Sequence, residues 1–119
     1  MSSTDDLRIA SLTELSPPSQ VMAEFARTPA ASATVTAARS ALHAILHGQD
    51  DRLAVVIGPC SIHDPEAAMD YAGRLLKQRQ RFGADLEILM RVYFEKPRTT
   101  VGWKGLINDP YLDGTFRIN

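Results

Sequence analysis

Two short apolar segments separated by a helical pattern constrain the fold of this chain more than any other feature. Residues 53–57 (Leu-Ala-Val-Val-Ile) form a β-branched apolar run that ends at Gly58-Pro59, as a strand buried on both faces does. Residues 86–92 (Leu-Glu-Ile-Leu-Met-Arg-Val) are predicted to form a second strand. Because a stretch with helical periodicity separates them, the sequence predicts a right-handed βαβ unit with parallel strands.

The stretch between the two segments carries clear helix signals. Asp64 offers an N-cap, Pro65 suits the first helical turn, and Glu66 is favourable near the positive end of the helix dipole. Apolar side chains recur at helical spacing and predict one buried face (Met69, Ala72, Leu75 and Leu76). We expect this helix to end at Gly83.

The residues that precede the first strand predict an arm and one helix. Prolines divide residues 1–33 into short pieces, which leaves at most a weak helix around residues 20–26. From Thr34 onward apolar residues recur at helical spacing up to Gly48, which suits a C-cap. We therefore divide the chain into an N-terminal arm and helix, residues 1–48, and a βαβ unit with the loop that follows it, residues 49–119.

Charge and hydropathy exclude several classes of function. A net charge of -1 argues against nucleic-acid binding and against attraction to an anionic membrane. The apolar run at residues 53–57 is far shorter than the roughly 20 residues of a membrane-spanning helix. Residues 1–6 carry acidic side chains where a secretory signal carries basic ones. We expect a cytoplasmic protein that binds neither membrane nor nucleic acid.

Polar and charged residues gather where each predicted strand ends. In parallel α/β folds the carboxyl ends of the strands form the edge at which ligands bind. Residues 58–64 follow the first strand and residues 91–100 follow the second. The second cluster combines cations with hydroxyl groups, as phosphate and carboxylate sites do (Arg91, Lys96, Arg98, Thr99, Thr100 and Lys104). It predicts an anion site, with a solvated basic loop as the alternative.

The histidines and the single cysteine leave several interpretations open. Cys60 cannot form an intramolecular disulfide, so it is a buried thiol, a nucleophile or a metal ligand. Cys60 and His63 have zinc-like spacing, but a structural zinc site needs four ligands. From the residues alone a buried thiol is favoured. His43 and His47 share one helix face, where we expect ordinary surface or interface residues.

Two long motifs resemble one enzyme family. Residues 55–65 (Val-Val-Ile-Gly-Pro-Cys-Ser-Ile-His-Asp-Pro) closely resemble the first strand and loop of type I 3-deoxy-7-phosphoheptulonate (DAHP) synthases. Residues 91–110, which include Lys-Pro-Arg-Thr-Thr-Val-Gly-Trp-Lys-Gly, resemble the second signature of that family. The two motifs occur in the family's order, and weaker similarity at residues 5–9 and 50–53 extends the resemblance over essentially the whole chain.

The resemblance implies the N-terminal portion, with the first two parallel strands, of a (β/α)8 barrel preceded by a helical arm. It implies a transferase that condenses phosphoenolpyruvate with erythrose 4-phosphate and water to give DAHP and phosphate, the first step of the shikimate pathway to aromatic amino acids. It also implies a fragment that ends before most of the barrel and is inactive alone. The alternative is a non-catalytic truncated product that binds phosphate or a full-length subunit.

The resemblance also implies roles for individual residues. Cys60 becomes one ligand of a divalent metal ion of the Mn, Fe, Co or Zn type, with a His, a Glu and an Asp supplied by later strands. Arg91 and Lys96 bind phosphoenolpyruvate, while Arg98 and Thr99 hold the phosphate of the sugar. Lys96 is in addition the candidate catalytic residue for proton transfer.

The arm resembles the N-terminal extension of family members that an aromatic amino acid inhibits. Residues 1–48 are therefore expected to serve regulation or oligomerisation, and the full-length protein is expected to be a homo-oligomer. Asp5 and Asp6 are candidates for a position near the inhibitor's ammonium group or at a subunit contact. A disordered acidic tip is the alternative for these two residues.

Overall fold

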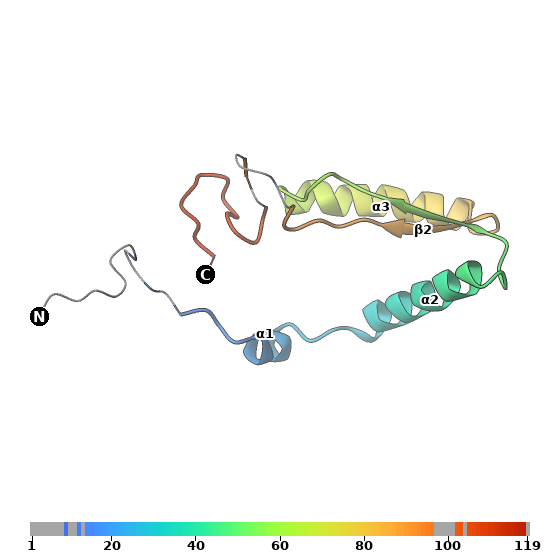
Figure 1. The fold of residues 1–119 in the computed structure, drawn as a ribbon, viewed down its shortest axis with the longest axis horizontal. Helices are drawn as coiled ribbons and strands as arrows, with labels where there is room; N and C mark the ends of the chain where they lie inside the picture. Colours follow the sequence, from blue (N-terminus) through green and yellow to red (C-terminus); the bar gives the residue numbers. More distant parts are fainter. Residues whose placement is uncertain (1–8, 10–11, 13, 97–101, 104, 119) are drawn as a thin grey trace, which may run out of the picture.

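The chain forms an elongated arm followed by a small α/β unit (Figure 1). The computed structural model describes residues 9, 12, 14–96, 102–103 and 105–118. Its elements in chain order are α1 (Pro18–Glu24), α2 (Pro29–Leu46), β1 (Leu53–Ile57), α3 (Pro65–Arg81) and β2 (Leu86–Met90). No helix among these described residues is both long and apolar enough to cross a membrane.

The two strands pair in parallel, as the sequence predicts. The register runs from Leu53 opposite Leu86 to Ile57 opposite Met90, and α3, which connects the strands, packs along β2. β2 ends at Met90, before the predicted end at residue 92. The ladder stops here because β1 runs into Pro59, whose nitrogen has no hydrogen to donate to a partner strand.

The signals that begin and end α3 act as predicted. The Asp64 carboxylate accepts hydrogen bonds from the backbone N–H groups of Glu66, at 2.8 Å, and Ala67, at 3.2 Å. Pro65 occupies the first turn, where a missing N–H costs nothing. The helix ends at Arg81, two positions before Gly83. Local capping chemistry therefore determines the bounds of α3.

The helix α2 begins earlier than predicted, at Pro29 instead of Thr34. The Thr28 hydroxyl accepts a hydrogen bond from the backbone N–H of Ala31 at 3.1 Å and so acts as the N-cap. Pro29 then lies in the first turn, a position where proline is favoured. The prediction was wrong because it treated this proline as a break. The end of α2 agrees with the prediction, since Gly48 has the positive φ of 68° that glycine tolerates.

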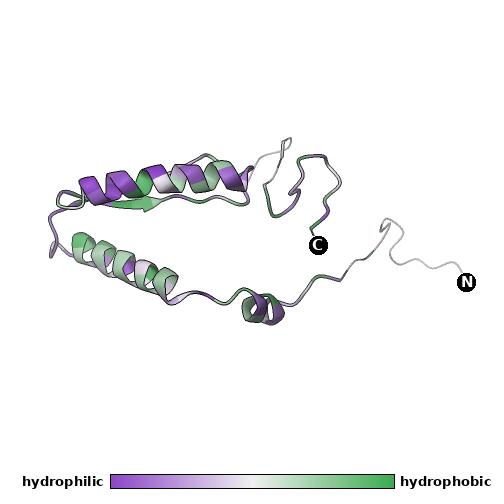
Figure 2. Cartoon of the chain, turned by 180° about the vertical axis from the view of Figure 1, so that it is seen from behind, coloured by the Kyte–Doolittle hydropathy of each residue, from purple (hydrophilic) through white to green (hydrophobic). Residues whose placement is uncertain are grey.

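The strand β1 is not buried on both faces, contrary to the prediction. Leu53 is 65% exposed and Val56 is 63% exposed, whereas Ile88 in β2 is only 7% exposed. Among the described residues only α2 and α3 pack against this sheet, and α3 contacts β2. Leu53, Val56 and Ile57 of β1 therefore lack a covering layer, whereas Ala54 and Val55 are half-buried. Figure 2 shows the strands in the green of hydrophobic residues, with α3 on one side of them and α2 apart from α3.

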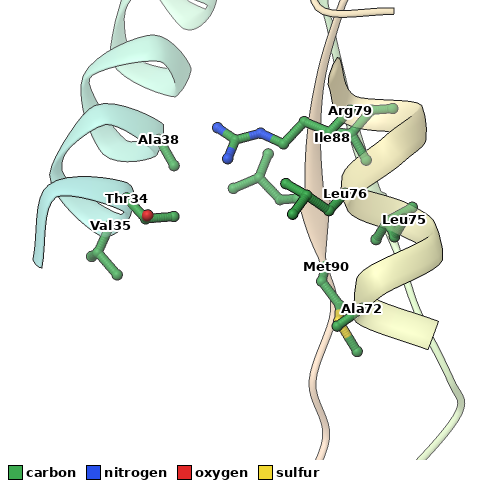
Figure 3. A pocket seen from close by; sticks show the side chains of 10 residues that line it. Thr34, Val35, Ala38, Ala72, Leu75, Leu76, Arg79, Ile88 and Met90 are labelled. Atoms are coloured by element: carbon green, nitrogen blue, oxygen red, sulfur yellow. The ribbon is translucent and has the colours of Figure 1, made fainter. Parts of the chain in front are cut away.

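The helix α2 contacts both strands but is not close-packed against α3. A cavity of about 310 Å³ lies between α2, α3 and β2. Thr34, Val35 and Ala38 line it on the α2 side, across from Leu76 and Ile88 (Figure 3). Most of the lining is apolar, so the gap leaves apolar faces of both helices without close contacts.

A buried ionic cluster ties α3 to both strands. Glu87, in β2, is 5% exposed and pairs with Arg79 of α3 at 2.7 Å and with Arg52, before β1, at 2.8 Å. Arg52 also contacts Asp50 at 2.7 Å, and the hydrogen bond from its side chain holds the pKa of Asp50 below its ordinary value. The cluster lies at the beginning of the strands, opposite the edge where the predicted site lies.

Candidate active site at the carboxyl ends of the strands

Backbone hydrogen bonds bring the two loops that follow the strands side by side. The N–H of Arg91 donates to the carbonyl of Ile57 at 2.8 Å, and the N–H of Ile62 donates to the carbonyl of Tyr93 at 2.8 Å. Residues 58–62 therefore lie against residues 91–93. This arrangement agrees with the prediction that both polar clusters share one edge of the sheet.

Gly58 permits the closest approach of the two loops. A Cβ atom at this position would lie 2.1 Å from the backbone carbonyl oxygen of Arg91. No side chain fits in that space, because the obstacle is backbone and cannot move aside by a rotamer change. The glycine thus allows the loop that carries Cys60 to pass beside Arg91.

The side chain of Arg91 is held against the first loop. Its Nη2 donates to the carbonyl oxygen of Pro59 at 2.8 Å and to that of Gly58 at 3.1 Å. The guanidinium carbon lies 5.6 Å from the centre of the Tyr93 ring. Its Nε is buried and has no hydrogen-bond partner within the described part of the chain. The guanidinium is therefore oriented and retains donor capacity for an anionic ligand.

The structure brings Lys96 and Cys60 into contact. Nζ of Lys96 donates to Sγ of Cys60 at 2.6 Å, although 36 positions of sequence separate the two residues. Cys60 is exposed, so the buried thiol favoured from the residues alone is wrong. Cys60 lies in the loop between β1 and α3, at the carboxyl end of β1. A cation, an oriented guanidinium and a thiol thus gather at one edge.

Cys60 fits the role of one metal ligand but does not form a metal site by itself. The thiolate is the form of cysteine that binds metal ions, and the exposed sulfur at the strand end is accessible to one. Within the described ranges no three His, Cys, Asp or Glu side chains lie close enough together to hold an ion. A metal ion bound by Cys60 therefore needs further ligands from outside these residues.

Several predicted site residues lie outside the described residues. Arg98 and Thr99, the candidates for the phosphate of the sugar, belong to this group, as do Asp5 and Asp6 of the arm. Their roles stay predictions. The described cations of the cluster, Arg91 and Lys96, do lie at the predicted edge.

Sequence reasoning missed the residue that organises the loop after the site. Asp109 is 5% exposed, and its carboxylate accepts hydrogen bonds from the backbone N–H groups of Gly114, at 3.1 Å, and Phe116, at 3.4 Å. Its carbonyl accepts from Nε1 of Trp103 at 2.9 Å. The sequence run Asn108-Asp109-Pro110 could have revealed this role, since an aspartate before proline often caps a turn. Trp103 is thus joined to this loop by a hydrogen bond to the Asp109 backbone.

The fold and the site define an α/β protein with a cationic edge, carrying Arg91 and Lys96, at the carboxyl ends of two parallel strands. A sequence model described as the DAHP synthetase I family matches residues 24–119, so the chain belongs to that family.

Named relatives and a solved structure agree with this assignment. The chain is 63% identical over 115 residues to the Phe-sensitive phospho-2-dehydro-3-deoxyheptonate aldolase of Escherichia coli strain K12, covering 97% of this chain and 33% of the relative. It is 56% identical to a Trp-sensitive aldolase of this kind from Enterobacter agglomerans, covering 100% of this chain and 34% of the relative. The structure of the aldolase from Francisella tularensis SCHU S4 superposes with a TM-score of 0.88 at 50% identity, covering 93% of this chain and 33% of that chain. The chain thus spans about a third of the length of these proteins.

The close approach at Gly58 leads to a prediction. In a chimaera in which this chain replaces the matching segment of the Phe-sensitive Escherichia coli relative, Gly58→Ala is expected to lower stability by roughly 1–3 kcal/mol, because the strand end must move away from Arg91. The matched control is Gly73→Ala in α3, where a Cβ meets nothing within 4 Å. That change should stabilise by about 0.5–1 kcal/mol through helix propensity. Thermal melting measures both, and equal melting temperatures for the two variants contradict the steric argument.

Proposed function

We propose that this chain forms the N-terminal part of a DAHP synthase. The enzyme condenses phosphoenolpyruvate with erythrose 4-phosphate and water, and it releases DAHP and phosphate. The observation that carries the proposal is the meeting of Arg91, Lys96 and Cys60 at one strand edge in a chain that belongs to the DAHP synthetase I family. In the whole enzyme β1 and β2 are the first strands of a (β/α)8 barrel, whose active site lies at this edge.

Two anionic substrates must meet in this site in spite of their mutual repulsion. Arg91 and Lys96 bind the phosphate and carboxylate groups of phosphoenolpyruvate, since a guanidinium fork and an ammonium group suit these anions. The buried Nε of Arg91 supports this role because the described residues supply no acceptor for this donor, which leaves its hydrogen bond to be made by a ligand or by a residue outside them. Arg98 and Thr99 hold the phosphate of erythrose 4-phosphate. The cations offset the repulsion that would otherwise keep the two phosphates apart.

A divalent metal ion, of the Mn, Fe, Co or Zn type, is part of the proposal. Cys60 is one of its ligands, and the exposed position of the sulfur at the strand end supports this assignment. When bound, the ion supplies Lewis-acid polarisation of the sugar aldehyde.

Lys96 is the candidate for proton transfer as well as for anion binding. Its Nζ lies 2.6 Å from Cys60 Sγ, so the ammonium group lies beside the proposed metal ligand. From this position the ammonium group orients the anion and carries a proton close to the reacting carbons. A general acid or base has to be within hydrogen-bond reach of the group it serves, and the position of Lys96 beside Cys60 supports this role for a ligand bound at this edge.

Inhibition by an aromatic amino acid is also part of the proposal. The names of two relatives state sensitivity to phenylalanine and to tryptophan, respectively. We assign the regulatory contact to the arm and helix of residues 1–48, acting in a homo-oligomer of the full-length protein. Exchanging residues 1–48 between differently regulated relatives tests this, because the inhibitor specificity should follow the arm if it forms the contact.

The chimaera described above tests the proposed activity directly. Its turnover of phosphoenolpyruvate and erythrose 4-phosphate with manganese is expected to be within about tenfold of the parent relative, which corresponds to about 1.4 kcal/mol in the barrier. The parent enzyme, purified in parallel, is the control. A chimaera that melts cooperatively and forms no DAHP contradicts the proposal and favours a non-catalytic product.

The proposal assigns Arg98 to the sugar phosphate and Arg91 and Lys96 to phosphoenolpyruvate, and this assignment leads to a second prediction. Arg98→Ala in the chimaera should weaken the apparent affinity for erythrose 4-phosphate by roughly ten- to hundredfold and change that for phosphoenolpyruvate little, since a charge-assisted contact contributes about 1.5–3 kcal/mol. Steady-state kinetics with each substrate varied in turn measure the two effects. Arg74→Ala is the matched control, because Arg74 is a surface residue of α3 that pairs with Asp70. Equal losses for both substrates show that Arg98 does not serve the sugar alone.

A further inference from the structure

Two histidines at the end of α2 form a pair outside the site described above. His43 lies in the last turn of α2, His47 is its C-cap, and both side chains are exposed. Their ring centroids are 4.0 Å apart and their planes differ by 19°. Residues at positions i and i+4 lie one above the other on a helix surface, which accounts for this stacking. The pair therefore presents two imidazole groups to solvent at the end of α2.

One backbone contact determines which nitrogen of His47 is available. Nδ1 of His47 lies 2.8 Å from the carbonyl oxygen of His43. A carbonyl oxygen only accepts, so Nδ1 carries the hydrogen, and in the neutral ring the lone pair is on Nε2. A hydrogen bond of this kind from the second ring nitrogen to a backbone carbonyl is how proteins orient a histidine that binds a metal ion.

We propose that His43 and His47 form a surface site for a borderline divalent transition-metal ion, with Cu²⁺ bound more tightly than Ni²⁺ or Zn²⁺. Imidazole suits these ions, and copper binds most strongly among them. Two histidines at i and i+4 on one helix face are the arrangement in which helices hold zinc. The His43 ring must turn out of the stack so that its lone pair converges with Nε2 of His47 on the ion, a rotation that the exposure of His43 allows, while His47 keeps its hydrogen bond to the carbonyl of His43.

This site is separate from the proposed metal ligand Cys60. α2 leads into the beginning of β1, whereas Cys60 follows the end of β1, so the two positions lie at opposite ends of that strand. No third His, Cys, Asp or Glu completes a group with the histidines among the residues that the structure describes. Water or another small ligand takes the remaining coordination positions of the ion.

The test compares the Cu²⁺ affinity of the chimaera with that of matched histidine variants by isothermal titration. His43→Gln and His47→Gln, each alone, should lower the affinity by at least about tenfold, because the second imidazole acts at a high effective concentration. The affinities of the same variants for Ni²⁺ and for Zn²⁺ should also be lower than those of the parent chimaera. Circular dichroism melts check that α2 and the rest of the protein stay folded.

Two double variants test whether binding requires the i and i+4 spacing of the histidines or only their number. Arg39→His combined with His47→Gln rebuilds an i and i+4 pair one turn earlier on α2, so binding should recover. Gln49→His combined with His47→Gln keeps the number of histidines but places the second one beyond the helix end, so binding should stay weak. Equal affinity in the parent and both single variants, or equal affinity in the two double variants, overturns the proposal.

Discussion

Cys60→Ala in the chimaera is expected to abolish metal-dependent turnover, with a loss of at least about a hundredfold, and to leave the melting temperature nearly unchanged. The side chain is exposed at the end of β1, so its removal opens no cavity in a packed core. Removing a thiolate ligand lowers the affinity for the ion and with it the Lewis acidity available to the aldehyde. Mutation of a residue that only orients a metal ligand usually lowers metal affinity or activity by roughly 10- to 100-fold. The loss of turnover in Cys60→Ala should be larger, because the ligand itself is removed.

Metal analysis of the purified variant and its rate at saturating manganese measure this effect. Ser61→Ala is the control, because it changes the neighbouring side chain and keeps the thiol. Normal metal content together with normal turnover in Cys60→Ala refutes the ligand assignment. Lys96 contacts the same sulfur, so Lys96→Ala should lower the rate and leave metal content closer to normal.

Residues 1–119 expressed alone are expected to show neither a cooperative thermal transition nor any condensation product. The strands β1 and β2 form a two-stranded sheet, and β1 has no second neighbour among the described residues. Leu53, Val56 and Ile57 remain 65%, 63% and 47% exposed. Unpaired strand edges with apolar side chains associate with other chains, so aggregation or a loosely packed monomer should result.

Catalysis should fail in this chain for an independent reason. Among the described residues no three His, Cys, Asp or Glu side chains lie close enough together to hold a metal ion. A single thiolate does not fix the coordination geometry of such an ion. Circular dichroism on heating and a DAHP assay with manganese and both substrates measure the two outcomes. A sharp melt together with metal-dependent turnover would show that copies of this chain complete the site for one another.

Much of the local structure could be predicted because neighbouring residues determine it. The cap of α3 by Asp64 and the glycine at the end of α2 depend on contacts within one turn of helix. The start of α2 was predicted wrongly from the same kind of signal. Pro29 is compatible with either a break or a first turn, and the Thr28 cap decided in favour of the helix.

The sequence by itself determined the order of the elements, the parallel pairing of β1 and β2, and the positions of Cys60 and Arg91 after the strands. Those features follow from periodicity and from the rule that parallel strands end at one edge. Only the tertiary structure decided that Lys96 touches Cys60, that Glu87 is buried between two arginines, and that β1 is exposed. Contacts between residues distant in sequence depend on the side chains that pack from other elements, and no local pattern encodes them.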